Sequence, residues 1–256
     1  MKSVNSHLIK AQQLSKNPLI PRNPKIILMG TPNVNLKLFA HRMGIDFGVC
    51  ALSLKQMYKT ILAYEDVYSN QTFYRKVIKI LKNPNINESA AELEAENIPE
   101  KLITLTKYSD KGYVLFDYPS TETQAKSLEK NSDGGINLAL NLLLKKEVGF
   151  FRENSKHQCE NCDRVYYKDD FINQPEGYDL KGFFPENGVC VDCGSHKITK
   201  ISDNEKFNES YENYEKKLLE LAPYYNTLGL LQNYEIKKGL EDYEEIRRQV
   251  INNIKH

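Results

Sequence analysis

The chain has 256 residues, of which 40% are hydrophobic and 27% carry a charge. This hydrophobic content is enough to bury a core between layers on both faces of a sheet. Because 35 Lys and Arg residues nearly balance 34 Asp and Glu residues, the net charge of +1 provides no general attraction to nucleic acid or to membrane surfaces. No apolar run reaches the ~18 to 20 residues that span a bilayer. We therefore expect a globular protein without a transmembrane segment or a specific nucleic-acid partner.

The charge is distributed unevenly along the chain. Residues 1–45 contain seven Lys or Arg and no Asp or Glu. An acid-free, Ser-containing, basic start is typical of a mitochondrial targeting segment, although this one is richer in Lys than in Arg. We interpret residues 1–24 as a basic N-terminal extension that serves as a targeting signal or as an anchor to a partner. The predicted location is the mitochondrial matrix side, with the cytoplasm as the alternative.

The first half of the chain alternates between strand and helix patterns. Apolar runs closed by Gly or Pro predict buried strands, and apolar residues three and four apart predict helices. In chain order we expect a strand at 25–29, a helix through Leu36, Phe39 and Met43, a helical stretch at 54–81, an acidic helix around 92–96, and a strand at 113–116.

The second half continues this alternation around one exception. We expect two helices after Ser120, the second with an apolar face of leucines between 138 and 144, and then a strand at 148–151. The helical period returns from Asn204, and a last amphipathic helix covers roughly 242–254. Strands that alternate with helices predict an α/β fold, a parallel sheet with helices on both faces. Residues 152–201 are the exception, because they are polar and interrupt the alternation.

Four of the five cysteines lie in this polar insertion. They form two Cys-x-x-Cys pairs, Cys159 with Cys162 and Cys190 with Cys193, separated by 27 residues. Thiolates three residues apart around a tight turn can both face one tetrahedral ion, and two such turns complete four-coordination. Because all four positions are then filled, we predict a structural zinc ion that stabilises the insertion. The alternatives are a pair of disulfides or four unrelated thiols, and Cys50 is interpreted as a small buried residue.

From about Pro24 to His256 the order of segments resembles the adenylate kinase family, part of which carries a zinc-bearing lid. The best stretches are 25–44, 112–127, 152–162 and 202–231. The resemblance implies a P-loop nucleoside-monophosphate-kinase-like fold, with a core at 25–151 and 202–256 and a zinc-binding lid at 152–201.

The phosphate loop departs from the family pattern. Such a loop needs glycines that let backbone N–H groups point at phosphates, a Lys for their charge, and a Ser or Thr for Mg²⁺. Here Gly30 and Pro32 match. The other two glycines, the lysine and the hydroxyl residue fall on Asn33, Asn35, Leu36 and Leu38. Lys37 lies beside the lysine position, but the next residue on a helix is rotated by ~100°.

At most of the other positions that the resemblance marks for function, this chain lacks the family's residue. The acidic residue after the second strand falls on Phe116, with Asp117 one place later, and the arginine that grips the monophosphate falls on Ser120. Gln124 resembles the glutamine that reads adenine, and Arg152 matches a lid arginine. The remaining family positions fall on Cys50, Lys55, Lys156, His157, Lys200, Ser202 and Tyr211.

Phosphoryl transfer depends on positioning and charge stabilisation, and one lost contact commonly costs about 3 kcal/mol in the barrier. The combined losses predict a pseudoenzyme without catalytic residues, in which ATP or AMP binding is doubtful. Its weak nucleotide-site remnants are Gly30, Lys37, Gln124 and Arg152. The alternatives are a divergent active nucleoside-monophosphate kinase that uses Lys37 and Arg152, or a non-catalytic nucleotide sensor that keeps Gln124.

A pseudoenzyme with this fold is expected to act as a structural accessory subunit of a large assembly. The 16 tyrosines suit protein interfaces, although they also suit a core. With the basic N-terminus, a respiratory-chain complex is the first expectation, a mitochondrial ribosome the second, and a cytoskeletal or ciliary assembly the third.

Overall fold

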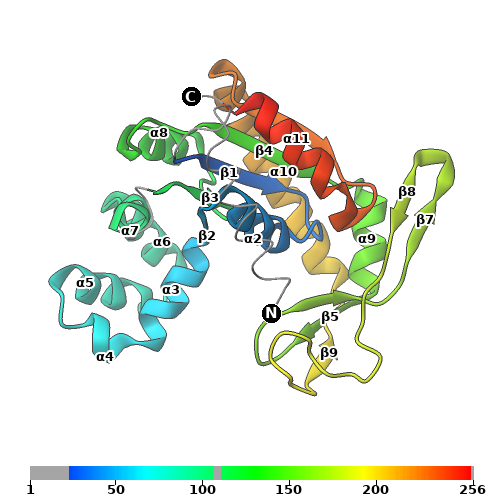
Figure 1. Cartoon of the computed structure of the whole chain (residues 1–256). Helices are drawn as coiled ribbons and strands as arrows, with labels where there is room; N and C mark the ends of the chain where they lie inside the picture. The colour runs from blue at the N-terminus through cyan, green and yellow to red at the C-terminus, as the bar shows by residue number, and fades with distance from the viewer. Residues whose placement is uncertain (1–22, 106–110, 255–256) are drawn as a thin grey trace. The chain divides into compact units, whose positions relative to one another are not determined.

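The computed structural model describes residues 23–105 and 111–254, which divide into two compact units. Of these, residues 23–27, 40–105, 111–138 and 254 belong to the first unit, and residues 28–39 and 139–253 to the second. A five-stranded sheet has the strand order β10-β4-β1-β3-β2, with helices around it (Figure 1). The pairs β1–β3, β2–β3 and β4–β10 are parallel. The predicted α/β fold is confirmed.

Strand β1 (Lys25–Gly30) begins the sheet, and its residues Ile26 and Ile27 are fully buried. In the first unit it pairs with β3 (Tyr113–Leu115), which also pairs with β2 (Cys50–Leu52). The helices of this unit are α3 (Leu54–Ala63), α4 (Glu65–Tyr68), α5 (Thr72–Leu81), α6 (Ile86–Ala95), α7 (Ile98–Leu105) and α8 (Glu122–Asn131). Helix α2 (Leu36–Phe47) begins in the second unit and ends in the first.

The second unit contains β4 (Leu138–Leu143) and β10 (Leu231–Glu235), which pair in register from Ala139 with Leu231 to Leu143 with Glu235. Helices α9 (Lys146–Asn154), α10 (Asn204–Thr227) and α11 (Tyr243–Asn253) and the 3₁₀ turn η3 (Gly239–Asp242) complete its frame. None of the described helices is long and apolar enough to cross a membrane.

Residues 156–200 of this unit form two small antiparallel sheets. One has the order β6-β5-β9, from β5 (Lys156–Cys159), β6 (Val165–Tyr167) and β9 (Ile198–Lys200). The other is a hairpin of β7 (Phe171–Asn173) and β8 (Tyr178–Leu180), joined by the 3₁₀ turn η2 (Gln174–Glu176). In Figure 1 the hairpin lies beside α9.

Two of the sequence predictions were wrong. Residues 138–143 form strand β4 rather than part of a helix, and residues 148–151 lie in helix α9 rather than in a strand. Strand β4 is buried along almost its whole length. A strand buried on both faces shows a continuous apolar run without alternation, which periodicity cannot distinguish from a buried helix.

Other boundaries differ from the predictions in detail. The predicted helical stretch at 54–81 is three helices, α3, α4 and α5, and the acidic helix is longer and is followed by α7. Cys50 is half-buried in β2 rather than fully buried. Strands β1 and β3 and helices α2, α10 and α11 form where the sequence predicts them.

Candidate functional site

The loop between β1 and α2 keeps a backbone shaped for glycine although two asparagines occupy it. Asn33 and Asn35 both have φ of 66°, in the left-handed region that favours glycine and next tolerates asparagine. The buried Thr31 fixes the start of the loop to β4, because its N–H donates to Leu142 O at 3.0 Å and its Oγ1 accepts from the N–H of Leu144 at 2.8 Å. The loop therefore has a backbone that favours glycine at two positions occupied by asparagine.

The side chain of Asn33 is fully engaged by the second unit. Its Nδ2 donates to the carbonyl oxygen of Gly149 at 2.9 Å and to Glu153 Oε2 at 2.8 Å. Its Oδ1 accepts from the hydroxyl of Tyr167 at 3.4 Å. One asparagine thus ties the loop to helix α9 and to strand β6.

Glu153 places a buried carboxylate beside this loop. Its side chain is 5% exposed, and it accepts hydrogen bonds from three groups. Besides Asn33, they are Lys156 Nζ at 3.0 Å and the N–H of Asp203 at 3.2 Å. Lys156, which stands at a family arginine position, is therefore paired with a carboxylate inside the chain.

The predicted remnants Gly30, Lys37 and Arg152 lie in different surroundings. A Cβ atom added to Gly30 would lie 2.9 Å from Leu36 Cδ2. Leu36 therefore packs against Gly30. Lys37, the next residue, is exposed. Arg152 stacks on Tyr167, with its guanidinium carbon 3.8 Å from the ring centroid, and burial lowers the pKa of Arg152.

In the first unit, Asp117 caps helix α3. Its carboxylate accepts from Ser53 Oγ at 2.6 Å, from the N–H of Leu54 at 2.8 Å and from the N–H of Lys55 at 3.0 Å. A carboxylate at a helix N-terminus satisfies free N–H groups and interacts favourably with the helix dipole. The acidic residue next to the family position thus has a structural role in this chain.

Gln124 and Ser120 also bond within the first unit. Gln124 Oε1 accepts from the N–H of Ser120 at 2.8 Å, and Gln124 Nε2 donates to Glu94 Oε1 at 3.3 Å. The Thr121 hydroxyl accepts from the N–H of Gln124, so this segment forms the capped start of α8. Both functional groups of the Gln124 amide therefore have partners inside the unit.

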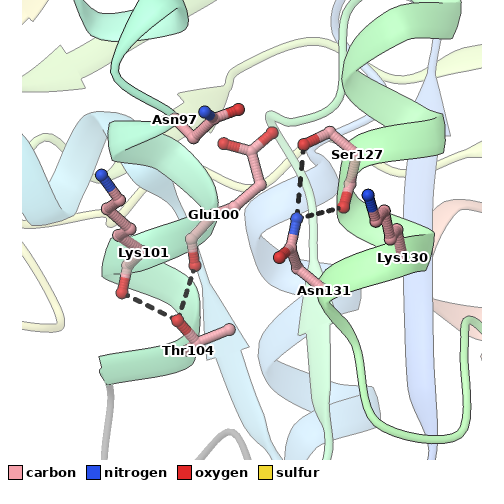
Figure 2. Close-up of a pocket in the computed structure, with 7 residues that line it drawn as sticks. All are labelled: Asn97, Glu100, Lys101, Thr104, Ser127, Lys130 and Asn131. Atoms are coloured by element: carbon pink, nitrogen blue, oxygen red, sulfur yellow. Dashed lines mark hydrogen bonds between the residues drawn. The ribbon is translucent and has the colours of Figure 1, made fainter.

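A polar pocket of about 320 Å³ lies between α7 and α8 in the first unit (Figure 2). It is lined by Asn97, Glu100, Lys101, Thr104, Ser127, Lys130 and Asn131. Glu100 is 5% exposed and accepts a 2.5 Å hydrogen bond from Tyr118 Oη. Thr104 and Asn131 bond to groups of their own helices, as the dashed lines in Figure 2 show. None of the predicted nucleotide-site remnants lines this pocket.

The four predicted zinc ligands come together. The Sγ atoms of Cys159, Cys162, Cys190 and Cys193 all lie within 4.8 Å of one another. Cys159 Sγ is 3.6 Å from Cys193 Sγ, and Cys162 Sγ is 3.5 Å from Cys190 Sγ. Four thiolates around zinc at ~2.3 Å stand about 3.8 Å apart. The donor set and its spacing fit a tetrahedral structural zinc ion, which these four side chains would hold.

The two Cys-x-x-Cys turns share one backbone pattern. Each first cysteine accepts from the N–H four residues later, Asp163 or Gly194, and donates to the carbonyl five residues later, of Arg164 or Ser195. The residue at the fourth position has positive φ in both turns, 58° at Asp163 and 72° at Gly194. Two matching turns present their thiols to the same point.

Hydrogen bonds prepare part of the cluster for metal binding. Although desolvation raises it, hydrogen bonds from Tyr166 and from the backbone N–H groups of Cys193 and Asp192 lower the pKa of Cys190 to about 6. Tyr166 Oη lies 3.1 Å from Cys190 Sγ and also accepts from the N–H of Val191. Such outer-shell partners orient metal ligands. The thiolate form that binds zinc is thereby favoured.

The sequence pattern did not single out Asn33, Glu153, Tyr166 or Tyr167 for these roles. Their contacts join residues from 24 to 134 positions apart. Periodicity and local motifs carry no signal for such pairs. The CxxC spacing did identify all four thiols, because each pair is a local turn.

No protein-family model matches the chain. Among curated proteins, it is similar to the adenylate kinase of Carboxydothermus hydrogenoformans, with 25% identity over 85% of this chain and 94% of that protein. It is also similar to the adenylate kinases of Thermosipho melanesiensis, with 23% identity over 90% of this chain and 99% of that protein, and of Halobacterium salinarum, with 23% identity over 82% and 88%.

The matches thus extend over nearly the full length of these relatives. They agree with the parallel sheet and with the four-cysteine cluster in the segment that the sequence marks as a lid. The chain is thus similar to adenylate kinases over most of its length, and it carries a cluster of four cysteines.

Proposed function

We propose that this chain is an adenylate-kinase-like protein that has lost phosphoryl transfer and serves as a structural subunit. The observation that carries the proposal is the contact between Asn33 and Glu153. A phosphate loop stabilises negative charge with free N–H groups and a cation. Here the loop instead donates to a buried carboxylate of its own chain, which would repel a phosphate.

The arrangement of cations supports the same proposal. Lys156 is paired with Glu153, Arg152 stacks on Tyr167, and Leu36 occupies the lysine position against Gly30. Lys37 is exposed one position along the helix. Phosphoryl transfer relies on preorganised positive charge. These contacts leave little positive charge in position to bind a γ-phosphate.

The compartment and the assembly stay predictions. The basic extension at 1–24 motivates a mitochondrial assembly, with a respiratory-chain complex first, and residues 1–22 of it lie outside the described residues. Recovery of the protein only as a free monomer after affinity purification and mass spectrometry would contradict the subunit role.

The second candidate is a protein that binds adenine nucleotides, either as an active kinase or as a sensor. The similarity over 94% and 99% of two relatives favours it, because their name states that they act on adenylate. It argues against the expectation that nucleotide binding is doubtful. Calorimetry with ATP and with AMP measures binding separately from turnover.

A coupled assay of ADP formation from ATP and AMP, with zinc-loaded full-length protein, tests the proposal. We expect no turnover above background. Turnover that disappears in Lys37→Ala and persists in Lys79→Ala, an exposed lysine on α5, would overturn it. Tight ATP binding without turnover would support the sensor over a purely structural role.

A further inference from the structure

The hairpin β7–β8 is attached to the rest of the second unit by residues that belong to no metal or nucleotide motif. It follows the turn of Cys159 and Cys162 in the chain, and it carries neither cysteine pair. Its contacts run instead to α9, to the end of β10 and to the turn that follows β10.

Tyr178 is the centre of these contacts. It is 1% exposed, and its Oη donates to Glu235 Oε1 at 2.6 Å. Lys145 Nζ and Lys237 Nζ lie 5.8 Å and 5.6 Å from its ring centroid, within reach of a cation–π interaction. Burial raises the pKa of Tyr178, so the hydroxyl stays protonated and can donate.

The backbone and the aromatic rings extend the attachment. The N–H of Asp179 donates to the carbonyl oxygen of Lys237 at 2.9 Å, and Lys237 Nζ donates to the carbonyl oxygen of Glu176 at 2.8 Å. Phe171 lies 5.7 Å from Tyr178 and 5.2 Å from Phe151 of α9, between ring centroids. A row of three aromatic rings thus joins α9 to the hairpin.

The turn after β10, which the hairpin contacts, is itself fixed by hydrogen bonds. Asp242 Oδ2 accepts from the N–H groups of Lys237 and Lys238 at 2.7 Å and 2.6 Å, and Asp242 is buried. The turn that receives Tyr178 and Asp179 is therefore fixed to η3.

These contacts differ in weight. The ion pair of Lys145 and Glu176, 2.7 Å long, joins side chains that are 41% and 43% exposed, and exposed pairs contribute little. A buried tyrosine contributes a large apolar area, and its hydrogen bond to a carboxylate is of the stronger, charge-assisted kind. Tyr178 therefore dominates the attachment.

We propose that Tyr178 is a latch that fastens the lid hairpin to the end of β10 and to the turn that follows it, so that the hairpin stays in place whether or not a nucleotide is present. In kinases, lids commonly close when substrate binds. A lid held by its own buried tyrosine is instead a fixed part of the unit. The inference goes beyond the proposed function, because it concerns how the hairpin is held and not the chemistry of the site.

Hydrogen exchange of the full-length, zinc-loaded protein tests the latch, because the Asp179 amide reports directly on the bond to Lys237. The variants are Tyr178→Phe, which removes only the hydroxyl, Tyr178→Ala, and the control Lys181→Ala. Lys181 forms ion pairs with Asp170 and Asp179, both of which also lie in residues 152–201. All are measured with and without ATP.

We expect exchange at Asp179 to rise severalfold in Tyr178→Phe and at least about tenfold in Tyr178→Ala, since local opening becomes easier. Lys181→Ala and ATP should leave it unchanged, and the zinc content should stay the same in every variant. Wild-type exchange as fast as that of Tyr178→Ala would overturn the latch. So would a wild-type hairpin that becomes protected only when ATP is added.

Discussion

Asn33 Nδ2 donates to Glu153 Oε2 at 2.8 Å, across 120 residues of sequence. The bond joins a loop with a glycine-like backbone to a buried carboxylate on α9. A glycine at position 33 could keep the backbone but not the bond. The side chain of Asn33 therefore has a structural role where the family resemblance places a phosphate-binding glycine.

Replacing the two loop asparagines by glycine should have different effects, although both have φ of 66°. Asn33→Gly removes the donor to Glu153 and to Gly149 O, and we expect it to lower the free energy of unfolding by about 1–2 kcal/mol. Asn35→Gly relieves the left-handed backbone, and we expect a change within about 0.5 kcal/mol of zero, or a small gain. Urea unfolding measures both. Equal losses in the two variants would contradict the role of Asn33.

Removing the Asp117 carboxylate should destabilise helix α3. In Asp117→Ala the N–H groups of Leu54 and Lys55 and the hydroxyl of Ser53 lose their acceptor. A lost cap costs about 1–2 kcal/mol. Thermal unfolding should show a lower midpoint, whereas Asp66→Ala, which changes an exposed carboxylate in α4, should not. An unchanged midpoint for Asp117→Ala would show that the cap contributes nothing.

One zinc ion per chain should be released when one cysteine pair is removed. In Cys159→Ser with Cys162→Ser, two of the four thiol ligands are gone, so the cluster cannot complete its tetrahedral shell. Elemental analysis should find no zinc, and residues 156–200 should lose protection from proteolysis while the five-stranded sheet stays folded. Cys50→Ser is the control, since Cys50 lies outside the cluster and should leave the metal content unchanged.

Tyr118→Phe should lower the free energy of unfolding by more than the removal of a tyrosine hydroxyl usually does. The hydroxyl donates to Glu100 at 2.5 Å, and Glu100 is only 5% exposed. A buried carboxylate that loses its donor keeps the cost of desolvation without the hydrogen bond. We therefore expect the free energy of unfolding to fall by about 2–3 kcal/mol. The double variant Tyr118→Phe, Glu100→Leu should recover part of that loss. A single variant as stable as wild type would exclude a structural role for this bond.

Local patterns predicted much of the fold and the four cysteines that come together. Strands β1 and β3 end in glycine or proline turns, and each CxxC pair is a turn of a few residues. The predictions failed at β4 and α9, where short apolar runs fit both a strand and a helix. There the sheet partner decides, because β4 pairs with β10 some 90 residues later.

The sequence by itself determined that four thiols would gather, because the spacing of each pair fixes a local turn, and that the positions where the family resemblance places a lysine and a hydroxyl residue are Leu36 and Leu38. Only the tertiary structure decided which contacts the residues of this loop and of the hairpin make. Asn33, Glu153 and Tyr167 meet, and Tyr178 reaches Glu235, through contacts between distant segments. Such contacts depend on how the elements pack, and no local pattern encodes them.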